Sequence, residues 1–94
     1  MKDKKRLGRV AALGCLIHEG ADATIHHVKR WRRRPGDDTG CARDDRYVLS
    51  LCPYCHQDGP IGDAVERGVE SWEAKHGTQA YWLDVVAAML GEDT

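Results

Sequence analysis

Two cysteine-containing half-sites, far apart in the sequence, constrain this chain more than any other feature. Cys52 and Cys55 form a C-x2-C pattern, and Cys15 and His18 form a C-x2-H pattern of the same spacing. Three thiolates and one imidazole are an established ligand set for a tetrahedral structural zinc ion. We therefore expect one Zn²⁺ ion to join the two half-sites.

Two alternatives to this ligand set stay open. Cys41 lies in a polar segment without a partner at the same spacing, and it is an alternative to His18 as the fourth ligand. Cys15 and His18 can also be interpreted as a buried apolar thiol and an unrelated surface histidine.

The small size of the chain explains why a metal would matter. It has 94 residues and no phenylalanine, and a single domain of this size builds only a slight core. Metal binding that closes a long loop would add directly to the folding free energy. We expect a basic N-terminal arm over residues 1–11 and one zinc-containing domain over residues 12–94.

The expected compartment follows from the pattern of the N-terminal residues and from the length of the apolar segments. The sequence shows no signal-peptide pattern and no apolar segment of membrane-spanning length. We therefore expect a cytoplasmic protein that does not associate with membranes. In that reducing compartment, clustered cysteines bind metal more often than they form disulfides.

The residue patterns predict an α+β chain in which strands come first and helices last. Alternating apolar residues indicate two strands, a polar segment with glycine and proline separates them, and apolar residues at helical spacing follow the C-x2-C pattern. The expected elements are strands at 23–29 and 47–51, an exposed loop at 29–45, and helices at about 62–76 and 78–90.

Charge is distributed unevenly along the chain. Residues 1–34 contain ten lysines and arginines against three acidic residues, although the net charge of the whole chain is −1. Such a split favours a polyanionic partner on the basic side, and the alternative is a solvated basic tail beside an acidic helical end. The residues expected to contact nucleic-acid phosphates are Arg30, Arg32, Arg33 and Arg34.

Three histidines are candidates for a second site. His26 and His27 stand together at the end of the first predicted strand, and His56 directly follows the C-x2-C pattern. Neighbours in a regular strand point to opposite faces, so both members of the pair can serve one site only where the chain twists at the strand end. A hairpin would bring His56 back toward this pair.

The order of these motifs resembles the HNH (ββα-metal, His-Me finger) endonuclease superfamily. It is most similar to zinc-containing phage and prophage members of the recombination-enhancement type. The resemblance covers about residues 12–90. The matching motifs are Cys15-x2-His18, Ile25-His26-His27-Val28, Leu51-Cys52-Pro53-x-Cys55-His56 and the tail segment 71–79.

The resemblance implies a small zinc-stapled ββα-metal domain with C-terminal helices and a metal-dependent DNA endonuclease activity. His26 and His56 would bind a catalytic divalent ion, Mg²⁺, Mn²⁺ or another, and His27 would be the general base that takes a proton from the attacking water. The residues that the resemblance implies as structural zinc ligands are Cys15, His18, Cys52 and Cys55.

The sequence departs from the family pattern at two places. Tyr47 stands where many HNH enzymes have asparagine, and the first tail segment lacks the histidine that the related group often has. Asp63 and Glu66 are the nearby alternatives for an oxygen ligand to the divalent ion. Both can also be solvent-facing helix charges.

Expected partners are DNA and either a second copy of the chain or phage or host DNA-processing proteins. The main alternative function is a non-catalytic zinc-binding module that only binds nucleic acid. A further alternative is a protein-interaction domain that uses its acidic helices against a basic partner.

Overall fold

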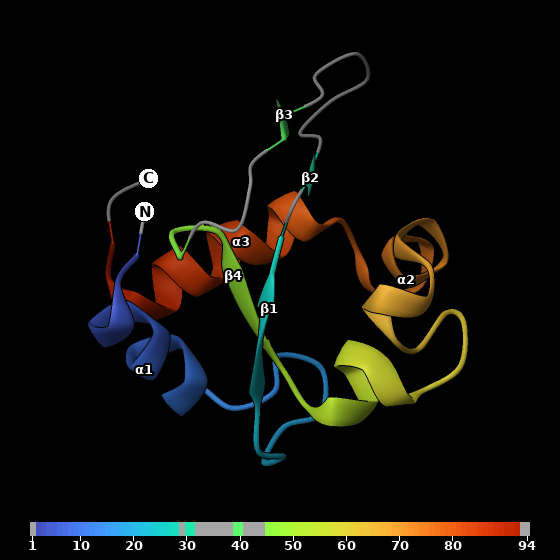
Figure 1. Ribbon diagram of the computed structural model, residues 1–94, viewed down its shortest axis with the longest axis horizontal. Helices are drawn as coiled ribbons and strands as arrows, with labels where there is room; N and C mark the ends of the chain where they lie inside the picture. The colour runs from blue at the N-terminus through green and yellow to red at the C-terminus, as the bar shows by residue number, and fades with distance from the viewer. Residues whose placement is uncertain (1, 29, 32–38, 41–44, 93–94) are drawn as a thin grey trace.

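The computed structural model describes residues 2–28, 30–31, 39–40 and 45–92, and it has an α+β architecture built on one antiparallel hairpin (Figure 1). The elements in chain order are α1 (Lys4–Ala12), β1 (Thr24–His27), β2 (Arg30–Trp31), β3 (Thr39–Gly40), β4 (Val48–Leu51), η1 (Tyr54–Asp58), η2 (Val65–Arg67), α2 (Val69–His76) and α3 (Gln79–Leu90).

The central hairpin pairs β1 with β4. Thr24 lies opposite Leu51 and His27 lies opposite Val48, so the two strands that the sequence predicts form one antiparallel ladder. All four residues of β4 are buried, whereas β1 has only His26 buried. The hairpin therefore places its first strand, which carries both paired histidines, nearer to the surface than its second.

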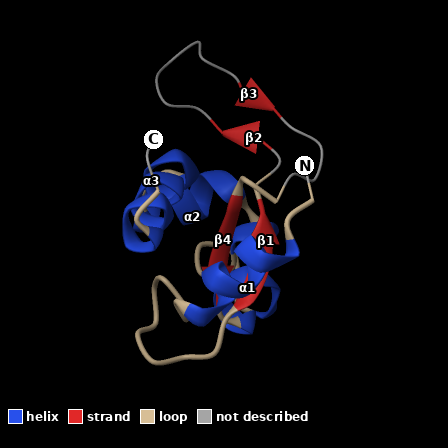
Figure 2. Cartoon of the chain, turned by 90° about the vertical axis from the view of Figure 1, so that its left-hand side faces the viewer, coloured by secondary structure: helices blue, strands red, loops and turns tan. Residues whose placement is uncertain are grey.

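The segment between these strands contains a second, smaller pairing. Arg30–Trp31 and Thr39–Gly40 form an antiparallel pair within the segment that the sequence predicts as an exposed loop. Figure 2 shows this pair beyond the end of the β1–β4 hairpin.

Most of the segment predicted as a basic arm is a helix in the structure. Residues Lys4–Ala12 form α1, and Asp3 caps this helix by accepting a hydrogen bond from the Arg6 backbone N–H at 3.0 Å. Val10 on α1 is fully buried, and α1 contacts β1, β4 and α3. The N-terminal segment is thus a packed part of the domain, because its apolar face covers the hairpin.

The helical tail follows the predicted order but begins with shorter turns. The sequence predicts one helix from about residue 62, and instead a 3-10 turn, η2, precedes α2. The backbone is extended at Gly68, which separates the two. The break between α2 and α3 is as predicted: Gly77 ends α2 with a φ of 101°, and the Thr78 hydroxyl caps α3.

The core lies between the hairpin and the helices at the two ends of the chain. Its largest fully buried side chains come from every layer: Trp72 from α2, Leu49 and Leu51 from β4, Val10 from α1 and Val86 from α3. None of the described helices has both the length and the apolar character needed to cross a bilayer. The hairpin and its flanking helices therefore form one core, which fixes where the histidines and cysteines lie.

Candidate metal centres

The two half-sites predicted from the cysteine pattern meet in space. Cys15 follows α1, Cys52 follows β4 and Cys55 lies in η1, and together with His18 they place four ligand atoms within 4.8 Å of one another. The His18 Nδ1 atom lies 3.1 Å from Cys55 Sγ and 3.5 Å from Cys52 Sγ. A tetrahedral ion with bonds of about 2.3 Å separates its sulfur ligands by roughly 3.8 Å, so this group can hold a metal such as zinc.

Backbone hydrogen bonds hold the first half-site against the second. The Leu16 N–H donates to the Ser50 carbonyl at 3.0 Å, which fastens the Cys15 turn to β4. The Cys15 N–H donates to the Ala21 carbonyl at 3.0 Å and closes the turn. The turn is therefore set in place by the same strand that leads into the C-x2-C pattern.

The ionisation of the thiols fits a cation at this position. Burial, reinforced by the neighbouring Cys52 and Cys15 sulfurs, raises the pKa of Cys55. Burial also acts to raise the pKa of Cys15, but hydrogen bonds from the backbone of His18 and Cys52 outweigh it and lower that pKa. All three described cysteines are free thiols. A bound cation would offset the repulsion between several thiolates in one buried group.

A second ligand group joins β1, η1 and η2. His26, His56 and Glu66 place their ligand atoms within 4.8 Å of one another. The Glu66 Oε1 atom lies 3.4 Å from His56 Nε2 and 3.6 Å from His26 Nδ1, and the two imidazole centroids are 5.3 Å apart. Ligand atoms of one cation with bonds of about 2.1 Å lie roughly 3.0–3.4 Å apart, so the group is close to a coordinating geometry.

The polar atoms of this second group are placed so that they could hold a cation. The His26 side chain is buried, and its Nδ1 atom has no hydrogen-bond partner among the residues that the structure describes. Burial lowers the pKa of His26, which keeps the imidazole in the neutral form that binds metals. An unpartnered buried nitrogen beside a carboxylate oxygen is costly unless a positive charge lies between them.

Glu66 leaves this second group open to solvent. Its side chain is 42% exposed, and its other oxygen, Oε2, accepts a hydrogen bond from the Gln57 side chain at 3.3 Å. Gln57 thereby orients Oε1 toward the two imidazoles. Three ligands on a partly exposed edge would leave coordination positions open on a bound ion, whereas the four ligands of the Cys15, His18, Cys52 and Cys55 group would fill a tetrahedral one.

His27 does not join either ligand group among the described residues. It is the last residue of β1, and its Nε2 atom lies 2.8 Å from Asp45 Oδ1. Hydrogen bonds from the Asp3 backbone N–H, at 2.7 Å, and from His27 lower the pKa of Asp45. An ionised Asp45 only accepts hydrogen bonds, so His27 Nε2 carries a proton, and Nδ1 is the nitrogen that has the lone pair when the ring is neutral.

The remaining candidates predicted from the sequence have separate outcomes. Asp63 is held by Lys75 and by the Tyr54 hydroxyl, so of the two proposed oxygen ligands only Glu66 reaches the histidines. The Arg30 backbone lies in β2. The candidates that lie outside the described residues are Arg32, Arg33, Arg34 and Cys41.

Sequence reasoning missed three residues that contact the candidate ligands. Asp45 contacts His27, Gln79 contacts His26, and Thr24 contacts His56. Gln79 closes the tail segment that carries part of the family resemblance, so its position was a usable signal. Asp45 and Thr24 carry no comparable pattern in the sequence.

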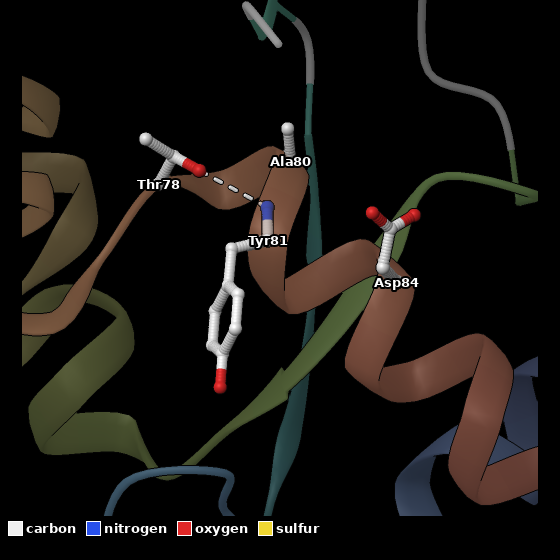
Figure 3. Close-up of a pocket in the computed structure, with 4 residues that line it drawn as sticks. All are labelled: Thr78, Ala80, Tyr81 and Asp84. Carbon is white, nitrogen blue, oxygen red and sulfur yellow. Dashed lines mark hydrogen bonds between the residues drawn. The ribbon is translucent and has the colours of Figure 1, made fainter.

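A pocket near the start of α3 is lined by residues that belong to neither ligand group. It is lined by Thr78, Ala80, Tyr81 and Asp84, with the Thr78 hydroxyl turned to the Tyr81 backbone (Figure 3). None of these four residues belongs to a ligand group. The candidate metal-binding residues are therefore those of the histidine and cysteine groups.

Comparisons with protein-family models, with curated proteins and with solved structures found no match to this chain. The geometry of the two ligand groups is accordingly the basis for a functional proposal.

Proposed function

We propose that this chain is a metal-dependent DNA endonuclease of the HNH type, with a ββα-metal site formed by β1, β4 and η1. The single observation that carries the proposal is the convergence of His26, His56 and Glu66 beside a separate Cys15 ligand group. A closed group of four ligands and an open group of three suit different tasks, one structural and one catalytic.

The open group supplies what phosphodiester hydrolysis needs. His26 and His56 would hold a divalent cation, with Glu66 as the third ligand. When bound, such a cation stabilises negative charge on the reacting phosphate. The chain's own contribution is to orient both imidazoles and to keep His26 neutral, because burial lowers the pKa of His26.

His27 is the proposed general base. Its Nε2–H donates to Asp45, so Nδ1 is free to accept a proton from water. Its side chain is 14% exposed and lies at the end of β1, next to His26 in the sequence. Asp45 would orient the ring and stabilise the imidazolium that forms, as the third group of a nucleophile–base–orienter arrangement does.

The proposed substrate follows from charge in the sequence. Residues 1–34 carry a strong excess of basic residues, and contacts of such residues with phosphates give affinity without sequence choice. The arginine-rich segment follows directly on the strand that carries His26 and His27. We therefore propose that Arg30, Arg32, Arg33 and Arg34 bind the DNA backbone near the site of hydrolysis.

The test is a plasmid-nicking assay with Mg²⁺, Mn²⁺ or Ni²⁺, run on the wild type and on His27→Ala. We expect nicking by the wild type and a loss of about 100-fold or more in His27→Ala, because a positioned base contributes roughly 10²–10⁴ in rate. Zinc content and the far-UV spectrum should stay the same. His76→Gln is the matched histidine control, since His76 lies outside both ligand groups.

Two results would count against the enzyme. The first is a folded, zinc-loaded wild type that nicks DNA with none of the three ions. If that protein still retards DNA in a gel, the non-catalytic nucleic-acid-binding module is the better account. The second is His27→Ala with the wild-type rate.

A further inference from the structure

We infer that Thr24 and Gln79 are positioning residues that fix the tautomers of His56 and His26, so that both imidazoles present a lone pair to one cation. The inference rests on the proposed cation site, and it concerns hydrogen bonds that the chain makes by itself. Neither residue was a candidate from the sequence, and neither is a ligand in its own right.

Thr24 determines the tautomer of His56. The Thr24 hydroxyl donates its only proton to the Leu51 carbonyl at 2.8 Å. Its 2.9 Å contact with His56 Nδ1 therefore has to be a hydrogen bond that the hydroxyl oxygen accepts. His56 consequently carries its proton on Nδ1, and the lone pair of Nε2 points toward Glu66 Oε1 at 3.4 Å.

Gln79 determines the tautomer of His26. Its side-chain carbonyl oxygen accepts from His26 Nε2 at 2.8 Å in a buried contact. The proton therefore lies on Nε2, which leaves the lone pair on the unpartnered Nδ1. Gln79 is itself held at the start of α3, because its backbone N–H donates to the Glu73 carboxylate at 2.7 Å.

The two histidines thus hold opposite tautomers and yet aim at the same point. His56 is protonated on Nδ1 and His26 on Nε2, and the two remaining nitrogens both lie within 3.6 Å of Glu66 Oε1. Partners that hold the second ring nitrogen of a ligand histidine are worth roughly 10- to 100-fold in metal affinity. Thr24 and Gln79 therefore prepare the site before any cation arrives.

Thr24→Val tests the inference, with Thr24→Ser as the matched control that keeps the hydroxyl. Valine removes the acceptor for His56 Nδ1–H, and the Nε2–H form becomes favoured because it can donate to Glu66. Long-range ¹H–¹⁵N correlation spectra of protein carrying one equivalent of zinc report each tautomer directly. A Mn²⁺ titration followed by electron paramagnetic resonance reports the affinity of the second site.

The wild type and Thr24→Ser should show His56 protonated on Nδ1 and should bind Mn²⁺ alike. Thr24→Val should show the Nε2–H form and bind Mn²⁺ about 10- to 100-fold more weakly. Thr24→Val that keeps the Nδ1–H form, or that binds Mn²⁺ as tightly as the wild type, overturns the inference and leaves the proposed enzyme standing. A wild type that binds no Mn²⁺ overturns the proposed function as well. This result can be told from the previous one, because the wild type and both variants then share the same lack of Mn²⁺ binding.

Discussion

Replacing Cys52 by serine is expected to unfold the domain and release its zinc. Cys52 follows β4 directly and is 6% exposed, and its sulfur lies 3.5 Å from His18 Nδ1. Removing this thiolate takes one ligand from the metal group and leaves the Leu16–Ser50 backbone hydrogen bond to hold the Cys15 turn against β4. Serine keeps the size of the side chain, so any loss comes from the metal bond and little from packing.

The magnitude follows from comparing two free energies. At about 0.05–0.15 kcal/mol per residue, a chain of this length has a total stability on the order of 5–14 kcal/mol. Structural zinc sites of this ligand type contribute roughly 10–16 kcal/mol of apparent binding free energy. The zinc term is therefore as large as the whole stability, and a domain with so small a core should not fold without it.

The assay is a far-UV circular dichroism melt combined with elemental analysis for zinc. Cys52→Ser, or the wild type treated with a chelator, should lose both the zinc and the cooperative transition. Cys41→Ser is the control that should retain both, and it also tests the alternative in which Cys41 replaces His18. A zinc-free Cys52→Ser protein that melts cooperatively near the wild-type Tm would show that the domain folds without the metal.

Three further results are expected. Asp45→Asn should slow DNA cleavage on the order of 100-fold, because the proposed base loses its orienting carboxylate, and unchanged rates in the nicking assay would contradict this. Burial, with the nearby Lys75 charge, lowers the pKa of His76, so the folded state loses stability as the pH falls below the ordinary His pKa of 6.5. His76→Gln removes this group and should reduce the drop in Tm between pH 7.5 and pH 6.0, measured with excess zinc. An equal drop in the variant and the wild type would show that His76 is not the cause. Replacing Arg32, Arg33 and Arg34 by alanine should reduce the slope of log affinity for DNA against log salt concentration, by roughly 0.9 for each phosphate that the protein no longer neutralises. Fluorescence anisotropy measures this slope, and an identical slope in the variant and the wild type is the contrary result.

The parts of the fold that the sequence predicts well are those that depend on local chemistry. The α2–α3 boundary was predictable because Gly77 allows a positive φ and Thr78 can cap the next helix. The ligand group of Cys15, His18, Cys52 and Cys55 was predictable because two half-sites of the same spacing together supply the three thiolates and one imidazole of a structural zinc site. The two central strands were predictable from alternating apolar residues, within one or two residues at their ends.

The parts that the sequence does not predict depend on contacts between distant residues. The basic, polar residues 1–11 were predicted to form an arm, and contacts with distant residues hold this segment as a helix. Arg6 donates to the Asp45 carbonyl at 2.9 Å and forms an ion pair with Glu92 at 2.9 Å. Asp45 could not be found from spacing either, since it follows His27 by 18 residues. Gln79 follows His26 by 53 residues, and only its place at the end of the tail segment pointed to it.

The choice between two acidic residues in the tail shows the same limit. Asp63 and Glu66 lie three residues apart, and both have a histidine or lysine within reach in the fold. Lys75, on the next helix, takes Asp63, and this leaves Glu66 to the histidines. Periodicity could not separate the two, because the extended backbone at Gly68 interrupts the helix in which they were expected.

The most direct measurement of the central claim is an anomalous difference map from crystals grown with Mn²⁺, collected at energies that separate manganese from zinc. We expect a zinc peak among Cys15, His18, Cys52 and Cys55, and one manganese peak about 2 Å from both His26 Nδ1 and His56 Nε2. A map with zinc in place but no manganese density between these two nitrogens would contradict this expectation.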